Sequence, residues 1–267
     1  MSGAGAEKGG VWAGALAALS VLLFGLTGII RLLAGDGAGM AADMLRLAPP
    51  EHTGLPAEEY PAVAEMLTGY LTDRIAEFQY FREAGEEKIS AFHSYEAAHM
   101  ADCRGLIRLD SAVCLASLAT AAACLVWTGC AGRNRGCAVW RAFFRGAERS
   151  LLTLAALVLG LLLWAVLDFE GLFITFHRVA FRNDLWLLNP RTDLLIRLMP
   201  ETLFIHLGIK GLGCAALWAL AETAVIAVGG RRTRRNKHEI SGIRGASDGA
   251  AAEQGTDPYS GAGNQLR

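Results

Sequence analysis

Two segments of the chain place histidines among carboxylates and amides. The first, FHSYEAAHMADCRGL, holds Glu96, His99 and Asp102 at intervals of three residues. On a helix this spacing keeps the three side chains near one face, where a carboxylate can orient an imidazole, fix its tautomer and raise its basicity. The same pattern also suits a solvated helix face just outside a bilayer, and His93, which lies outside the spacing, fits surface decoration.

The second segment, DFEGLFITFHRVAFRNDLWLLNPRTDLLIRLMPE, covers residues 168–201. It sets His177 between aromatic residues, and its tryptophan and phenylalanines suit a membrane interface. Several polar groups at this depth are costly, which favours a functional site. An interface histidine and caps of turns or short helices are the alternatives. The candidate site residues here are His177, Asn183, Asp184, Asp193, Trp186, Phe176 and Phe181.

The composition identifies a membrane protein. Hydrophobic residues make up 53% of the 267 residues, and the mean hydropathy is +0.32. Uncharged apolar runs long enough to cross or nearly cross a bilayer cover residues 11–30, 111–132 and 151–167. A fourth run, 202–230, carries His206, Lys210 and Glu222. We therefore predict an all-α membrane protein with four transmembrane helices, an extracytoplasmic helical region and a structured outer loop.

The distribution of basic residues sets the predicted topology. Arginines are concentrated in residues 133–149 and again after residue 230, whereas 36–104 is richer in Asp and Glu. We expect both termini in the cytoplasm and the two histidine segments outside. The predicted order is 1–34 (N-terminus and first helix), 35–105 (extracytoplasmic helices), 106–132 (second helix), 133–149 (cytoplasmic loop), 150–168 (third helix), 169–201 (outer loop), 202–230 (fourth helix) and 231–267 (disordered cytoplasmic tail).

Three further features refine this picture. The first run could be a cleaved signal peptide, but its length and nearly uncharged leader favour a retained helix. The segment YPAVAEMLTGYLTDRIAEFQYF repeats apolar residues at helical spacing, which predicts an amphipathic helix over 60–81. A second short helix is expected from near Ser90 into the second transmembrane helix. The cysteines imply no disulfide framework.

If the second and third transmembrane helices form an antiparallel hairpin, His99 and His177 face a common outer pocket. Histidines with nearby carboxylates also suit zinc, but the second histidine of H-E-x-x-H is missing, so no metal or cofactor is predicted. A metal-dependent membrane hydrolase and a non-catalytic transporter or scaffold remain alternatives, the latter because Lys210 and Glu222 could mark a polar path. Nothing points to nucleic acid, and the oligomeric state is open.

The combined pattern resembles the lipoprotein intramolecular transacylase (Lit) family of bacterial membrane proteins over roughly residues 10–230. The matching motifs are E-x-x-H-M-x-D from Glu96, L-F-x-x-F-H-x-x-x-F-x-N-D-x-W from Leu172, P-x-x-D-x-L-I from Pro190 and P-E at Pro200. Tyr70 and Leu71 also fit. Cys103 departs from the pattern, which has a small aliphatic residue there, and the chain after about 231 has no counterpart.

The resemblance implies an enzyme acting on diacylglyceryl-modified lipoproteins within membrane lipids. It would move the sn-2 acyl chain from glycerol to the N-terminal cysteine amine and give the lyso-form lipoprotein. His99 is then expected as general base, oriented by Glu96 or Asp102, and His177 as oxyanion donor or as acid for the leaving oxygen, with an exchange of these roles left open. Asn183, Asp184, Trp186, Asp193, Phe176 and Phe181 are expected to shape the pocket.

Overall fold

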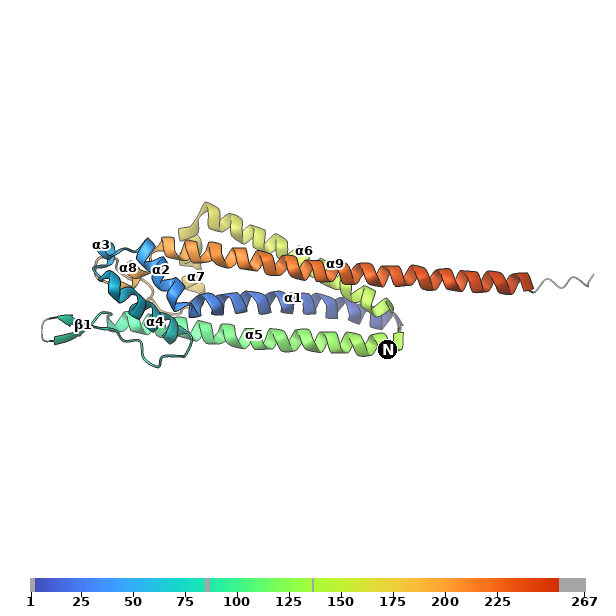
Figure 1. Cartoon of the computed structure of the whole chain (residues 1–267), viewed down its shortest axis with the longest axis horizontal. Helices are drawn as coiled ribbons and strands as arrows, with labels where there is room; N and C mark the ends of the chain where they lie inside the picture. The colour runs from blue at the N-terminus through green and yellow to red at the C-terminus, as the bar shows by residue number, and fades with distance from the viewer. Residues whose placement is uncertain (1–2, 85–86, 136, 255–267) are drawn as a thin grey trace, which may run out of the picture.

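Four long helices form the body of the protein in this computed structural model, which describes residues 3–84, 87–135 and 137–254 (Figure 1). They are α1 (Gly3–Gly35), α5 (Ser94–Arg135), α6 (Cys137–Leu167) and α9 (Glu201–Gln254). Each contains a stretch long and apolar enough to cross a membrane. The prediction of a helical membrane protein with four spanning helices is confirmed.

Helix α1 is the central element, because it packs against α5, α6 and α9. Small residues make this packing close, as is usual between membrane helices. A Cβ atom added at Gly14 would overlap the backbone of Phe143, and one added at Gly146 would overlap the backbone of Val11. The α1–α6 crossing therefore depends on glycine on both helices.

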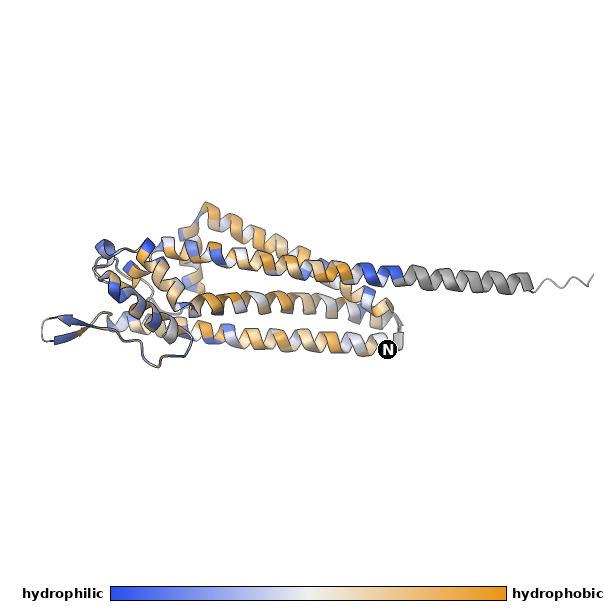
Figure 2. Ribbon diagram, viewed as in Figure 1, coloured by the Kyte–Doolittle hydropathy of each residue, from blue (hydrophilic) through white to orange (hydrophobic). Residues whose placement is uncertain are grey.

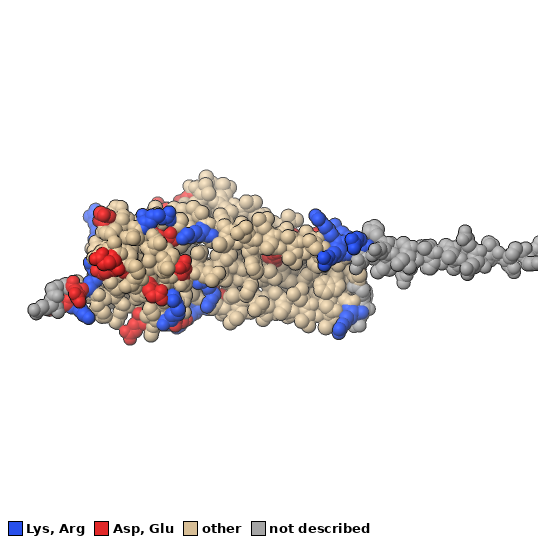
Figure 3. All heavy atoms as spheres, in the orientation of Figure 1, with Lys and Arg blue, Asp and Glu red and all other residues tan. Residues whose placement is uncertain are grey.

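Hydropathy and charge divide the molecule into a long apolar middle and two polar ends. Figure 2 shows apolar residues along the middle of the four helices, and Figure 3 places Lys and Arg at one end and a mixture of both charges at the other. The second half of α6 is exposed on all sides, with Leu157, Leu159 and Val166 61%, 66% and 82% exposed. Such a surface suits contact with lipid.

The mixed-charge end carries a cap of short helices. They are α2 (Gly37–Leu47), α3 (Pro50–Thr53), the 3₁₀ turn η1 (Ala57–Glu59), α4 (Tyr60–Leu71), α7 (Phe169–Ala180) and α8 (Leu194–Leu198). The apolar faces of α2, α4 and α8 share one core with the start of α9, and its fully buried members include Met44, Leu67, Leu198 and Leu203. The cap therefore joins residues 37–71 to the segment between α7 and α9.

The helix expected over 60–81 ends earlier, at Leu71. Asp73 adopts a left-handed conformation with φ 62°, which stops the helix. Hydrogen bonds from Arg108 and Arg104 hold the Asp73 carboxylate and lower its pKa to about 2. After this turn, β1 (Phe81–Ala84) and β2 (Glu87–Ser90) pair antiparallel in a hairpin that the sequence did not predict.

The long helices also extend beyond their predicted bounds. The helix expected from near Ser90 begins at Ser94 and continues without a break into the second membrane span as α5. In the segment 133–149, expected as a loop, residues 133–135 form the end of α5 and residues 137–149 the start of α6. The tail from 231, expected to be disordered, continues α9 to Gln254, and residues 255–267 lie outside the described part. Extending an existing helix needs no new nucleus, which favours these continuations.

Lys210 of α9 has a structural partner rather than a place in a polar path. Its Nζ donates to Oδ2 of Asp43 on α2 at 2.6 Å. Burial alone would raise the pKa of Asp43, but Lys210, with His206 and Arg46 also close, lowers it below its ordinary value. This cluster connects the cap to the first part of α9.

Candidate active site

The two histidine segments meet beneath the cap. His99 lies near the start of α5 and His177 in the last turn of α7, and their ring centroids are 6.1 Å apart. Both side chains are buried. Asn183 Nδ2 donates to Asp102 Oδ2 at 2.9 Å, so a second contact ties the segments together.

Aromatic rings surround His177. Its ring centroid lies 4.1 Å from that of Phe173, 5.3 Å from Phe176, 5.5 Å from Phe181 and 5.1 Å from Trp186. This burial lowers the pKa of His177, although a hydrogen bond to the Phe173 carbonyl opposes the shift. The imidazole is therefore neutral at pH 7.

The hydrogen bond to Phe173 also fixes the tautomer of His177. Nδ1 lies 2.8 Å from the Phe173 carbonyl oxygen, which can only accept, so Nδ1 carries the proton. Nε2 of the neutral ring then holds a lone pair, and none of the described residues donates a hydrogen bond to it. The geometry makes Nε2 a proton acceptor available to a substrate.

His99 has the complementary arrangement. Its Nε2 lies 3.5 Å from Sγ of Cys103, one helical turn further along α5. Its Nδ1 is buried and has no hydrogen-bond partner among the described residues. If the Cys103 thiol donates to Nε2, Nδ1 carries a proton and can donate to a substrate oxygen. Phe181 packs edge-on against the ring at 5.1 Å.

Glu96 does not orient His99, contrary to expectation. Its Oε2 accepts the backbone N–H of His93 at 2.6 Å, and its Oε1 accepts the backbone N–H of Leu195 at 2.8 Å. The first contact caps the start of α5, and the second satisfies the start of α8. Glu96 is fully buried and joins two helix ends, so its position in the motif reflects support of the site.

Replacing Glu96 with alanine is expected to destabilise the protein by about 3 kcal/mol, because one buried and one part-buried backbone N–H group lose their acceptor. Thermal unfolding in detergent micelles measures this. Glu58→Ala, which removes an exposed carboxylate, is the matched control and should leave the unfolding temperature nearly unchanged. Equal unfolding temperatures for the two variants would contradict the bridging role.

The other polar candidates shape the segment after α7. Asp193 precedes α8 but its side chain does not cap that helix; it accepts from the Tyr95 hydroxyl at 2.6 Å, from Thr192 and from the backbone N–H of Asn189. Asn183 also accepts the backbone N–H of Leu185. The Asp184 side chain is exposed and makes no hydrogen bond to either histidine or to any other group in the described part of the chain.

Residues that were not among the candidate site residues complete the site. Cys103 and Phe173 each lie four residues from a histidine, a spacing that places side chains together on a helix and offered a signal. Tyr95 also belongs here through Asp193. A cavity of about 250 Å³ adjoins His177, since Phe173 and Trp186 contribute to its wall together with Ile196 and Phe204.

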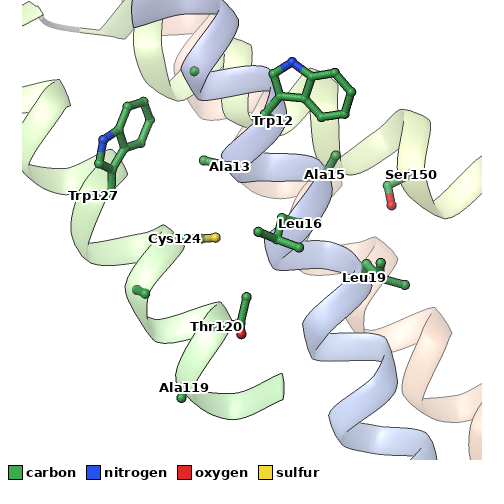
Figure 4. Close-up of a pocket in the computed structure, with 12 residues that line it drawn as sticks. Trp12, Ala13, Ala15, Leu16, Leu19, Ala119, Thr120, Cys124, Trp127 and Ser150 are labelled. Atoms are coloured by element: carbon green, nitrogen blue, oxygen red, sulfur yellow. The ribbon is translucent and has the colours of Figure 1, made fainter. Parts of the chain in front are cut away.

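A larger cavity of about 790 Å³ lies between α1 and α5, far from the histidines (Figure 4). Trp12, Leu16 and Trp127 line it, and Cys124 lies 25 residues beyond His99, about 37 Å along α5. No Asp, Glu or His contributes to this wall. This cavity contains none of the candidate site residues.

A model of the family described as lipoprotein intramolecular transacylase Lit matches residues 15–204, which include both histidine segments. The chain belongs to the Lit family. It is therefore an acyltransferase of lipoprotein maturation, embedded in the membrane, and this confirms the expected family and activity. A search of curated protein sequences found no match.

Solved structures agree with the fold of a Lit enzyme. The membrane-integral Lit of Bacillus cereus gives a TM-score of 0.61 at 16% identity, over 85% of this chain and 97% of that one. A form of the same protein with a histidine replaced by arginine gives 0.56 at 16% identity, over 88% and 94%. Among the described residues, no group of three or more His, Cys, Asp or Glu side chains is arranged to hold a metal ion.

Proposed function

We propose that the enzyme moves the sn-2 acyl chain of a diacylglyceryl-cysteine lipoprotein onto the α-amine of the same cysteine, giving the lyso-form lipoprotein. The observation that carries this proposal is the pair of buried histidines, each with one ring nitrogen left free for a substrate. Amide formation needs one group to accept the proton of the amine and another to stabilise the oxyanion.

The hydrogen bonds favour His177 as the general base. Its Nε2 takes a proton as the amine attacks the ester carbonyl, since an α-amine has a pKa of about 8 and becomes strongly acidic once it has added. His99 Nδ1–H donates to the oxyanion. The C–O bond to glycerol then breaks, and His177 returns the proton to the glycerol oxygen. One C–N bond replaces one C–O bond, so mass is conserved.

This order reverses the one first expected from the sequence, which made His99 the base. The reason is the hydrogen-bond partner of each ring. The Phe173 carbonyl fixes the proton of His177 on Nδ1, whereas both carboxylate oxygens of Glu96 accept backbone N–H groups and neither reaches His99. Asp102 lies near His99 but bonds to Asn183. Neither carboxylate hydrogen-bonds to His99 in the described structure, which removes the support for His99 as the base.

Lipopeptide rearrangement tests the function directly. The purified enzyme is incubated with a diacylglyceryl lipopeptide bearing distinguishable sn-1 and sn-2 chains, and fragmentation in a mass spectrometer locates each chain. The sn-2 chain is expected on the cysteine nitrogen, with the intact mass unchanged. Release of free fatty acid would show a hydrolase, and transfer of the sn-1 chain would refute the proposed regiochemistry.

Cys103 is expected to position His99 rather than carry the acyl chain. Because a thiol is a weak hydrogen-bond donor, Cys103→Ala should lower the initial rate by no more than about tenfold. Cys114→Ala, which changes a cysteine further along α5, is the control. Complete loss of activity in Cys103→Ala, together with a hydroxylamine-sensitive acyl-enzyme in the wild type, would replace direct amine attack by a thioester route.

We also propose that the site faces the extracytoplasmic side and that both termini lie in the cytoplasm. Arginines cluster at the opposite end of the bundle, around Arg133 and from Arg231 to Arg235, in keeping with a cytoplasmic location (Figure 3). Trypsin added to intact spheroplasts should cut the β1–β2 hairpin at Arg82 or Lys88. Cleavage there confined to inverted vesicles would overturn this orientation.

A further inference from the structure

A separate cavity of about 390 Å³ lies between α1, α6 and α9. Its wall is formed by aromatic and aliphatic side chains, among them Trp140, Phe144 and Trp218, with one carboxyl group, that of Glu222. Glu222 lies 18 residues beyond Phe204, about 27 Å along α9 from the cavity beside His177. The family match ends at residue 204 and does not include it.

No neighbouring group in the described part of the chain accounts for the buried carboxyl group of Glu222. Its side chain is 8% exposed, and both carboxyl oxygens are buried without a hydrogen-bond partner among the described residues. No Lys, Arg or His contributes to the cavity wall, and the Trp218 indole N–H already donates to the carbonyl of Val21 at 3.0 Å. Leaving a carboxyl group unpaired in an apolar site is unfavourable, so a ligand that supplies a hydrogen bond to Glu222 would be stabilised there.

The cavity has the make-up of a ligand site. Small-molecule pockets are mostly apolar, contain a few placed polar groups and measure about 300–1,000 Å³. The volume lies near the lower limit, which favours one hydrocarbon chain over two. An ammonium head would form a buried ion pair with Glu222. Its other N–H groups would have no acceptor in this apolar wall, and such a buried pair is energetically costly. A hydroxyl head has a single O–H donor, which Glu222 can accept.

We propose that this cavity binds a single-chain lipid with a hydroxyl head, its chain against the aromatic wall and its hydroxyl hydrogen-bonded to Glu222. Monoacylglycerols and long-chain alcohols share this chemistry. The site is distinct from the histidine pair, and its occupation does not depend on how acyl transfer proceeds.

Quenching of tryptophan fluorescence tests the site, because Trp140 and Trp218 line it. The full chain in detergent micelles is titrated with a dibrominated monoacylglycerol, a dibrominated long-chain alcohol and the unbrominated forms. Trp12, outside the cavity and 75% exposed, contributes quenching proportional to the probe fraction in the micelle. Binding is measured as the part of the quenching that saturates at low probe fraction. The hydroxyl probe that binds more tightly shows whether the preferred head group is that of a monoacylglycerol or that of a simple alcohol.

Two kinds of variant locate the binding. Ala221→Phe fills the cavity from an exposed wall position and should abolish the saturable component. Glu222→Leu should weaken binding about tenfold, whereas Glu222→Gln, which keeps a hydrogen-bonding group of the same size, should bind within a few-fold of wild type. Acyl transfer within about twofold of wild type shows that each variant is folded and separates this test from that of the catalytic proposal.

Three outcomes overturn the inference. Equal saturable quenching in the wild type and Ala221→Phe would place the probe elsewhere, and its absence in the wild type would leave the cavity without a lipid. Tighter binding of a dibrominated alkylammonium, lost in Glu222→Gln, would assign the head to a cation. Saturable quenching by the hydroxyl probes that depends on Ala221 and Glu222 as stated supports the proposal.

Discussion

His177→Ala is expected to slow acyl transfer by about 10²- to 10⁴-fold, the range typical for loss of a positioned general base. The expectation rests on the hydrogen bond that fixes the Nδ1 proton on the Phe173 carbonyl and leaves the Nε2 lone pair free. Initial rates with a diacylglyceryl lipopeptide measure the loss. The sn-2 chain should remain on glycerol over the time in which the wild type converts all of its substrate.

His93→Ala is the matched control for this variant. His93 belongs to the same end of the molecule, is exposed and stacks on Tyr95 at 5.2 Å, so its removal changes a histidine without entering the buried site. Its rate should remain close to that of the wild type. Undiminished activity in a folded His177→Ala enzyme would remove His177 from the mechanism.

The pH dependence gives a second signature of His177. A base works in its neutral form, and burial lowers the pKa of His177 below the ordinary 6.5. As pH falls, the rate first declines with protonation of the substrate amine near pH 8, and then declines more steeply below pH 6.5 as His177 is protonated. The second break should be absent in His177→Ala, whose residual rate follows the amine alone.

The sequence was sufficient to predict the spanning helices, which depend on local composition, and the proximity of the histidine segments, which depends on the order of the helices. Apolar length defines a membrane helix. In an antiparallel pair of helices, the start of the first lies beside the end of the second, and these are the two ends that carry His99 and His177. The contact between Asp102 and Asn183, 81 residues apart, supports the same proximity, although neither partner was assigned to the other beforehand.

The role of Glu96 was not predictable, because its partners depend on the tertiary path of the chain. Its spacing from His99 suggests support of the imidazole, yet the backbone N–H that it accepts belongs to Leu195, 99 residues away. A buried helix end needs an acceptor wherever it arrives. In the same way, the amphipathic pattern over 60–81 gave no sign that Asp73 would turn the chain toward Arg104 and Arg108.

His99→Ala is expected to slow acyl transfer by about 10²- to 10³-fold, as removal of one oxyanion donor does in other acyl-transfer enzymes. The buried Nδ1 without a partner is the atom lost. Because His177 remains, the steeper decline below pH 6.5 should persist in His99→Ala. Glutamine at position 99 retains an N–H donor and should recover part of the rate, which a base could not do through an amide.

The pair of pH profiles therefore assigns the two histidines independently of the size of either rate loss. A base is recognised by the break that disappears with it, whereas a donor changes the height of the profile and leaves its shape. Disappearance of the acid break in His99→Ala and its survival in His177→Ala would exchange the two roles. The free Nδ1 of His99 would then hold the lone pair, with the Nε2 proton donated to Cys103.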